Sequence, residues 1–158
     1  MDDTGLGSYA ERLDAVIAPL IGTAGALLPV LHAVQAAFGH IDDTAVPVIA
    51  ERLNLSRADV HGVLTFYHDF RRKPAGRTVL KLCRAEACQS MGADALAAQA
   101  EARLATPMHS TRDDGAVTLE PVYCLGLCSA APSAMLNGRV VARLTPQRLD
   151  TLLDAVAA

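Results

Sequence analysis

Tryptophan is absent from the 158-residue sequence, and aromatic residues make up only 4% of it. No apolar run approaches the roughly 18–20 residues that a transmembrane helix needs, so we expect no direct membrane insertion. The N-terminus, Met1-Asp2-Asp3-Thr4, lacks the apolar stretch of a signal peptide. The net charge is -3, whereas a nucleic-acid binder would usually carry a basic face. These absences predict a cytoplasmic protein that does not bind nucleic acid.

Several sequence motifs of enzymes are also missing. The chain has no GxGxxG fingerprint of a dinucleotide site and no Cys-X-X-Cys pair of a thioredoxin-type enzyme. No pair of carboxylates and no Ser-His-Asp set indicates hydrolysis. We therefore expect no enzymatic activity from this chain alone.

Alanine and leucine are abundant, and in the first half of the chain their spacing is helical. The pattern predicts one helix after Ser8, one over about 25–38, one over about 44–53 and one after Ser56. Capping-box sequences mark the first and last of these starts, and Gly39 is a plausible stop for the second helix. The first half is therefore expected to be a helical bundle.

A break in this pattern lies at 71–77, which combines a proline, a glycine and four positive charges. We expect a helical N-terminal domain over 1–72 and a second domain over 73–158.

The second domain alternates in character. Strands are predicted over 78–83 and 116–123, and an Ala-rich helix over 90–104. Asn137-Gly138 between two apolar segments is typical of a β-hairpin, and Thr145-Pro146 is typical of a helix start. The order β-α-β-β-α resembles a thioredoxin-like domain, so the fold class is predicted as α+β.

All four cysteines lie in this second domain. Four residues separate Cys83 from Cys88, 35 separate Cys88 from Cys124, and three separate Cys124 from Cys128. Each pair follows a predicted strand, so two loops at the same ends of neighbouring strands would bring the four sulfurs together. A [2Fe–2S] cluster takes four thiolates, which are the soft ligands that iron–sulfur chemistry selects.

Three other interpretations of the cysteines remain open. A structural zinc site also takes four cysteines, although its ligand pairs are usually spaced more closely. Two disulfides are disfavoured by a reducing cytoplasm, and a dithiol enzyme by the missing Cys-X-X-Cys pair.

The loops around the cysteines favour a cluster. Gly126 permits unusual backbone angles, and the small residues nearby leave N–H groups free to point at sulfur. Leu125 and Leu127 would limit the access of water. The positive charge of Arg84 would raise the reduction potential, because it stabilises the more negative reduced cluster.

The remaining candidates have simpler explanations. Phe66, Tyr67 and Phe70 are expected to pack in the core or between domains rather than to relay electrons. The histidines are expected to be surface or capping residues; they are His32, His40, His61, His68 and His109.

The motifs resemble a known family when they are taken in order. They are Phe66-Tyr67-His68-Asp69-Phe70, Lys73-Pro74-Ala75-Gly76-Arg77, Cys83 with Cys88, and Tyr123-Cys124-Leu125-Gly126-Leu127-Cys128 with Ala131-Pro132. From about residue 10 to its end, the chain resembles the thioredoxin-like [2Fe–2S] ferredoxins. That family includes the 24 kDa subunit of respiratory complex I and the matching subunits of NAD-reducing hydrogenases and soluble NAD-dependent formate dehydrogenases.

The resemblance implies that Cys83, Cys88, Cys124 and Cys128 bind one [2Fe–2S] cluster. It also implies a large partner subunit that carries FMN and the NAD site. The segment 122–128 is most similar to the gamma subunit of the molybdenum-containing formate dehydrogenases, with a complex I or hydrogenase subunit as the alternative. On this basis the chain is expected to be an electron-transfer subunit of an NAD-linked oxidoreductase.

Overall fold

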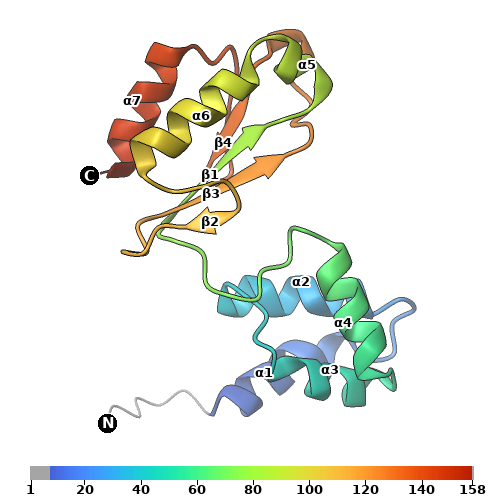
Figure 1. Cartoon of the computed structure of the whole chain (residues 1–158). Coiled ribbons are helices and arrows are strands. Elements are labelled where there is room, and N and C mark those ends of the chain that lie inside the picture. Colours follow the sequence, from blue (N-terminus) through green and yellow to red (C-terminus); the bar gives the residue numbers. More distant parts are fainter. Residues whose placement is uncertain (1–7, 158) are drawn as a thin grey trace. The chain divides into compact units, whose positions relative to one another are not determined.

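A computed structural model describes residues 8–157, and the acidic residues 1–4 considered above lie outside that range. Backbone contacts divide the chain into two compact units that separate between Pro74 and Ala75. The predicted α+β class is confirmed, with helices in the first unit and helices around a five-stranded sheet in the second (Figure 1). The expectation of domains over 1–72 and 73–158 that fold by themselves stays a prediction. No helix in the described range is long and apolar enough to cross a membrane.

The helical unit contains the four helices that the sequence predicts. They are α1 (Tyr9–Ile17), α2 (Leu27–Phe38), α3 (Ala45–Leu53) and α4 (Arg57–Phe66), with a short 3₁₀ helix, η1 (Ala18–Leu20), after the first. Both expected capping boxes are present, at the starts of α1 and α4. Gly39 ends α2 with a φ of 78°, a left-handed angle that glycine adopts without the steric cost of a side chain.

Aliphatic side chains fill the centre of the helical unit. Leu13, Ile17, Val30 and Ile49 are fully buried there, and Phe70 packs against them. The packing prediction is confirmed for Phe70 and wrong for Phe66, whose surface is 72% exposed. Phe66 is at the last position of α4, where no neighbouring element covers it.

The second unit, which we call the sheet unit, is ordered β2-β3-β1-β4-β5. Its strands are β1 (Thr78–Cys83), β2 (Ser110–Thr111), β3 (Val117–Val122), β4 (Ala134–Leu136) and β5 (Arg139–Val141). β1 and β3 are parallel, and the other neighbouring pairs are antiparallel. Asn137 and Gly138 both have positive φ, as a tight turn between β4 and β5 requires, so the predicted hairpin is confirmed.

Three helices complete the sheet unit: α5 (Glu86–Ser90), α6 (Ala93–Leu104) and α7 (Pro146–Ala157). The helix predicted over 90–104 begins at Ala93, and α5 and β2 were not predicted. Thr145 caps α7 as expected, because its side-chain oxygen accepts a hydrogen bond from the Arg148 N–H.

The sheet unit has two separate hydrophobic clusters. The larger, which we call the aliphatic core, joins the sheet to α6 and α7. Its buried members are Leu80, Leu82, Leu96, Ala97, Ala100, Leu104, Val117, Leu119, Ala134, Leu144, Leu149 and Leu153. The smaller, the cysteine core, contains Cys83, Cys88 and Ala93, with half-buried Ala85, Val122, Leu125 and Ala131 around them.

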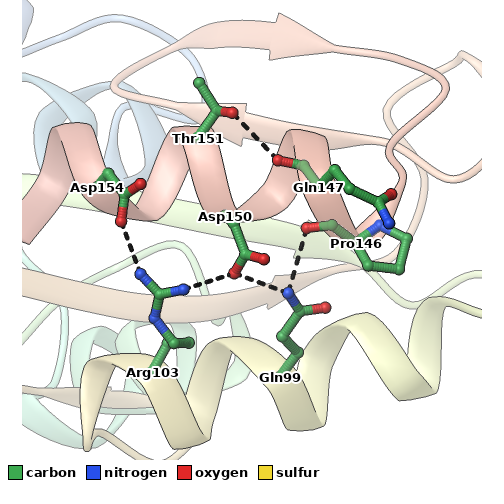
Figure 2. Close-up of polar contacts among 7 residues, drawn as sticks. All are labelled: Gln99, Arg103, Pro146, Gln147, Asp150, Thr151 and Asp154. Atoms are coloured by element: carbon green, nitrogen blue, oxygen red, sulfur yellow. Dashed lines mark hydrogen bonds and ion pairs between the residues drawn. The ribbon is translucent and has the colours of Figure 1, made fainter.

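Polar contacts join α6 to α7 at the surface of the aliphatic core, as Figure 2 shows. Arg103 donates to Asp150 at 2.8 Å and to Asp154 at 2.6 Å. Gln99 donates to Asp150 at 2.8 Å and to the Pro146 carbonyl at 3.2 Å. Two side chains of α6 thus hold the beginning and middle of α7.

Candidate metal centre

Two neighbouring strands deliver the cysteines to one edge of the sheet. Cys83 is the last residue of β1, and Cys124 comes two residues after the end of β3. The strands are parallel with Cys83 opposite Val122, so both loops leave the sheet at the same edge. The Arg84 N–H continues the pairing by donating to the Val122 carbonyl at 2.8 Å.

The four cysteines are free thiols arranged as two pairs. Cys124 and Cys128 are exposed, and their Sγ atoms are 3.6 Å apart. Cys83 and Cys88 are hydrogen-bonded to each other and are 3% and 2% exposed. The two pairs are close enough that Cys128 interacts electrostatically with both Cys83 and Cys88. All four predicted residues therefore converge at one place.

The second loop has an unusual backbone. Cys124 has a φ of 101° and Gly126 a φ of 74°, and a left-handed angle is uncommon for a residue with a side chain. Such backbone strain is concentrated at functional sites in proteins. The turn lets the Gly126 N–H donate to the Cys124 sulfur at 3.3 Å. The expectation of loop N–H groups that point at sulfur therefore agrees with this structure.

The buried pair is surrounded by hydrogen-bond donors. The backbone N–H groups of Ala85 and Cys124 donate to the Cys83 sulfur. The Ser133 hydroxyl, on a residue that is 2% exposed, lies 3.7 Å from the Cys88 sulfur. Sequence reasoning missed Ser133, although it directly follows the Ala131-Pro132 motif.

Thiol ionisation reflects this close approach. Burial acts to raise the pKa of Cys83, but hydrogen bonds from Ala85, Cys88, Cys124 and Ser133 outweigh it and leave that pKa lowered. Burial raises the pKa of Cys88, and the hydrogen bond with Cys83 adds to the rise. The hydrogen bond with Cys124, and its charge, raise the pKa of Cys128. Within each pair a second thiolate is costly unless a cation offsets its charge.

Arg84 is beside the site, directly after Cys83. Its guanidinium donates to Asp94 at 2.8 Å, so part of its charge is balanced by the first turn of α6. Its Nε is buried and has no hydrogen-bond partner among the residues that the structure describes. Its predicted effect on the reduction potential stays a prediction.

The residues present fit a two-iron cluster. Four reduced thiolates in two pairs match the need of two irons for two protein ligands each. Within residues 8–157, no three His, Cys, Asp or Glu side chains gather tightly enough to hold a single metal ion. The thiols are electrostatically coupled across the site, yet they are grouped in twos, and we regard this pairing as the informative feature.

Leu125 and Leu127 are half-buried, so apolar groups do border the exposed pair. His61, His68 and His109 are exposed, as expected, and none of them is near the sulfurs in sequence. His32 packs its ring 4.9 Å from that of Phe70 in the helical unit. No histidine is thus needed to explain the site.

Comparison with known proteins places these observations in a family. The family model for thioredoxin-like [2Fe–2S] ferredoxins matches residues 13–157. A subunit of the NADH-quinone oxidoreductase of Pseudomonas aeruginosa is 34% identical over 130 residues, which are 82% of this chain and 78% of that protein. The subunit of the same name from Escherichia coli K12 is 36% identical over 129 residues, again 82% of this chain and 78% of that protein.

A solved structure supports the same relationship. The air-oxidized NAD⁺-reducing [NiFe]-hydrogenase contains a chain that aligns with a TM-score of 0.71 and 26% sequence identity. The alignment covers 85% of this chain but only 23% of the hydrogenase chain. This protein belongs to the thioredoxin-like [2Fe–2S] ferredoxin family.

Proposed function

We propose that Cys83, Cys88, Cys124 and Cys128 bind one [2Fe–2S] cluster, and that the chain transfers electrons as a subunit of an NAD-linked oxidoreductase. The observation that carries the proposal is the meeting of two cysteine pairs on loops at one edge of a parallel strand pair. When bound, such a cluster supplies one-electron redox chemistry. The chain itself supplies thiolates, hydrogen bonds to sulfur and partial burial.

The alternative from another class is a structural Cys₄ zinc module. Zinc needs its four ligands in a tetrahedron around one ion. The described cysteines are grouped in twos, with one pair buried and one exposed. This arrangement favours two irons over a single zinc ion.

The partner is inferred from the relatives. They are named as subunits of NADH-quinone oxidoreductase, and the structural neighbour is an NAD⁺-reducing hydrogenase. We infer a partner subunit that carries FMN and binds NAD, beside which the cluster accepts or holds single electrons. The whole complex is expected to be cytoplasmic.

Within that class, we favour a soluble NAD-dependent formate dehydrogenase with molybdenum in another subunit. The support is the segment Val122-Tyr123-Cys124-Leu125-Gly126-Leu127-Cys128, which resembles the gamma subunit of those enzymes. The alternatives are the 24 kDa-type subunit of complex I and the corresponding subunit of an NAD-reducing hydrogenase.

Cysteine variants of the full chain test the cluster. Cys88→Ser and Cys124→Ser remove one ligand from the buried and the exposed pair respectively, whereas Ser129→Ala changes an exposed serine beside Cys128. We expect the two cysteine variants to lose most of their iron and acid-labile sulfide, and the control to keep both. Full iron and sulfide in either cysteine variant would contradict the ligand assignment.

Purification from the native host tests the parent complex. A tagged full-length chain should co-purify with a flavin-containing, NAD-binding subunit. Molybdenum in the purified complex would support formate dehydrogenase, and membrane subunits would support complex I. Absence of any flavin-containing subunit would overturn the partner proposal.

A further inference from the structure

Ser133 contacts the buried cysteine pair through both its backbone and its side chain. Its carbonyl accepts a hydrogen bond from the Cys83 N–H at 3.0 Å, and its backbone N–H donates to the Cys88 sulfur. Its hydroxyl lies 3.7 Å from the Cys88 sulfur and also hydrogen-bonds with Cys83. The residue is 2% exposed, so water does not compete for these contacts.

The backbone around Ser133 is fixed by the sheet. Ala134 is the first residue of β4 and pairs with Leu82 of β1, one residue before Cys83. On the other side, the Pro132 carbonyl accepts a hydrogen bond from the Leu144 N–H at 2.9 Å. A hydroxyl on such a support keeps its position, whereas one on a mobile loop would not.

The chemistry of the two groups sets the direction of the hydrogen bond. A thiolate that binds iron has no proton and can only accept, so the Ser133 hydroxyl must be the donor. Reduction adds one electron, and therefore one negative charge, to the cluster and its sulfur ligands. A hydrogen bond to a ligand sulfur is stronger in that more negative state, and it raises the reduction potential.

We propose that Ser133 is a positioning residue that raises the reduction potential of the cluster by donating its hydroxyl hydrogen bond to the Cys88 thiolate. The inference rests on the proposed function, because it requires a cluster on the four cysteines. It divides the roles of the two pairs. A rigid side-chain donor serves the buried pair, and the Gly126 N–H serves the exposed pair.

The test uses the full chain with Ser133→Ala, Ser133→Thr and the control Ser129→Ala. Ser129 is an exposed serine in the same loop, and Thr keeps the hydroxyl at position 133. Iron and sulfide content is measured first, and the midpoint potential is then obtained by redox titration followed by electron paramagnetic resonance. We expect Ser133→Ala to keep the cluster with a lower midpoint potential, and Ser129→Ala to match the unmodified chain.

A second readout follows the hydroxyl proton directly. Transfer into D₂O shifts the iron–sulfur stretching bands in resonance Raman spectra when exchangeable protons are bonded to sulfur. Part of that shift should be missing in Ser133→Ala and present in Ser133→Thr. A merely structural role for Ser133 would not move this signal.

Each outcome decides the matter. An unchanged potential in a fully loaded Ser133→Ala protein would overturn the inference and leave the proposed function intact. If Ser133→Ala loses the cluster, recovery of cluster and potential in Ser133→Thr supports the inference, and failure of both variants overturns it. If the unmodified chain holds no two-iron cluster, the proposed function itself fails.

Discussion

The two hydrophobic clusters of the sheet unit share the same strands but are built from different material. β1 contributes Leu80 and Leu82 to the aliphatic core and, one residue later, Cys83 to the cysteine core. The aliphatic core is closed by large side chains from two helices. The buried members of the cysteine core are two cysteines and one alanine.

The difference separates stability from function. Burial of large apolar side chains supplies most of the favourable free energy of folding, so the aliphatic core stabilises the unit. The cysteine core buries little apolar surface, holds residues at positive φ and directs N–H and O–H groups at sulfur. It depends on the stable end of the same sheet for its shape.

The largest expected effect comes from emptying the aliphatic core. Leu119 of β3 is fully buried, and Leu119→Ala should lower the free energy of unfolding by about 2–5 kcal/mol because it leaves a cavity. Urea unfolding of the full chain measures the change, and the spectrum of the bound cluster should stay the same. Leu125→Ala, at the half-buried edge of the cysteine core, is the matched control and should cost clearly less. Equal costs would remove the distinction between the two cores.

Next in size is a close backbone contact before β1. A Cβ on Gly76 would be 2.8 Å from the Val117 carbonyl carbon and 2.9 Å from its nitrogen, so the backbone would have to shift. Gly76→Ala should therefore cost about 1–3 kcal/mol of unfolding free energy, as overpacking does. The control is Gly62→Ala on α4, where a Cβ meets nothing within 4 Å.

There, alanine should stabilise the helix by up to about 1 kcal/mol. Thermal unfolding compares both glycine variants with the unmodified chain. If Gly76→Ala were as stable as the unmodified chain, the close approach to Val117 would not constrain this end of the sheet.

Removing the cluster should affect the cysteine end selectively. A bound group that is absent from the unfolded state stabilises the structure that holds it. Hydrogen exchange of peptides across 120–133 should speed up at least about tenfold after the metal is removed, which corresponds to about 1.4 kcal/mol. Peptides from α6 and α7 should change much less. A uniform increase across the chain would show that the two ends do not behave separately.

The smallest expected effect concerns the contacts in Figure 2. Arg103, Asp150 and Asp154 are all partly exposed, and exposed ion pairs contribute little. Arg103→Gln should lower the unfolding free energy by at most about 1 kcal/mol, and less at high salt. Urea unfolding at two salt concentrations measures this. A loss as large as that of Leu119→Ala would mean that surface pairs, and not the aliphatic core, hold α7.

Local signals made much of the fold predictable. The capping boxes at Ser8 and Ser56, the Asn137-Gly138 turn and the Thr145 cap each act within a few residues, and all are present in the structure. The alternation that predicts β1 and β3 also agrees with the structure, because each strand buries one face.

Features that depend on distant residues were missed. β2 has two residues and exists only through its pairing with β3, and α5 is too short to show a helical period. The exposure of Phe66 depends on what covers the end of α4. In the site, the cysteine spacing predicts which sulfurs meet, but Ser133 is brought to Cys88 by the pairing of β4 with β1. No spacing within the sequence reveals that contact.

Crystals of the full chain with its bound metal, measured at the iron absorption edge, provide the most direct test. We predict two iron peaks, one beside the sulfurs of Cys83 and Cys88 and the other beside those of Cys124 and Cys128. A single metal peak surrounded by all four sulfurs, or no iron signal with the cysteines apart, would contradict the two-iron site.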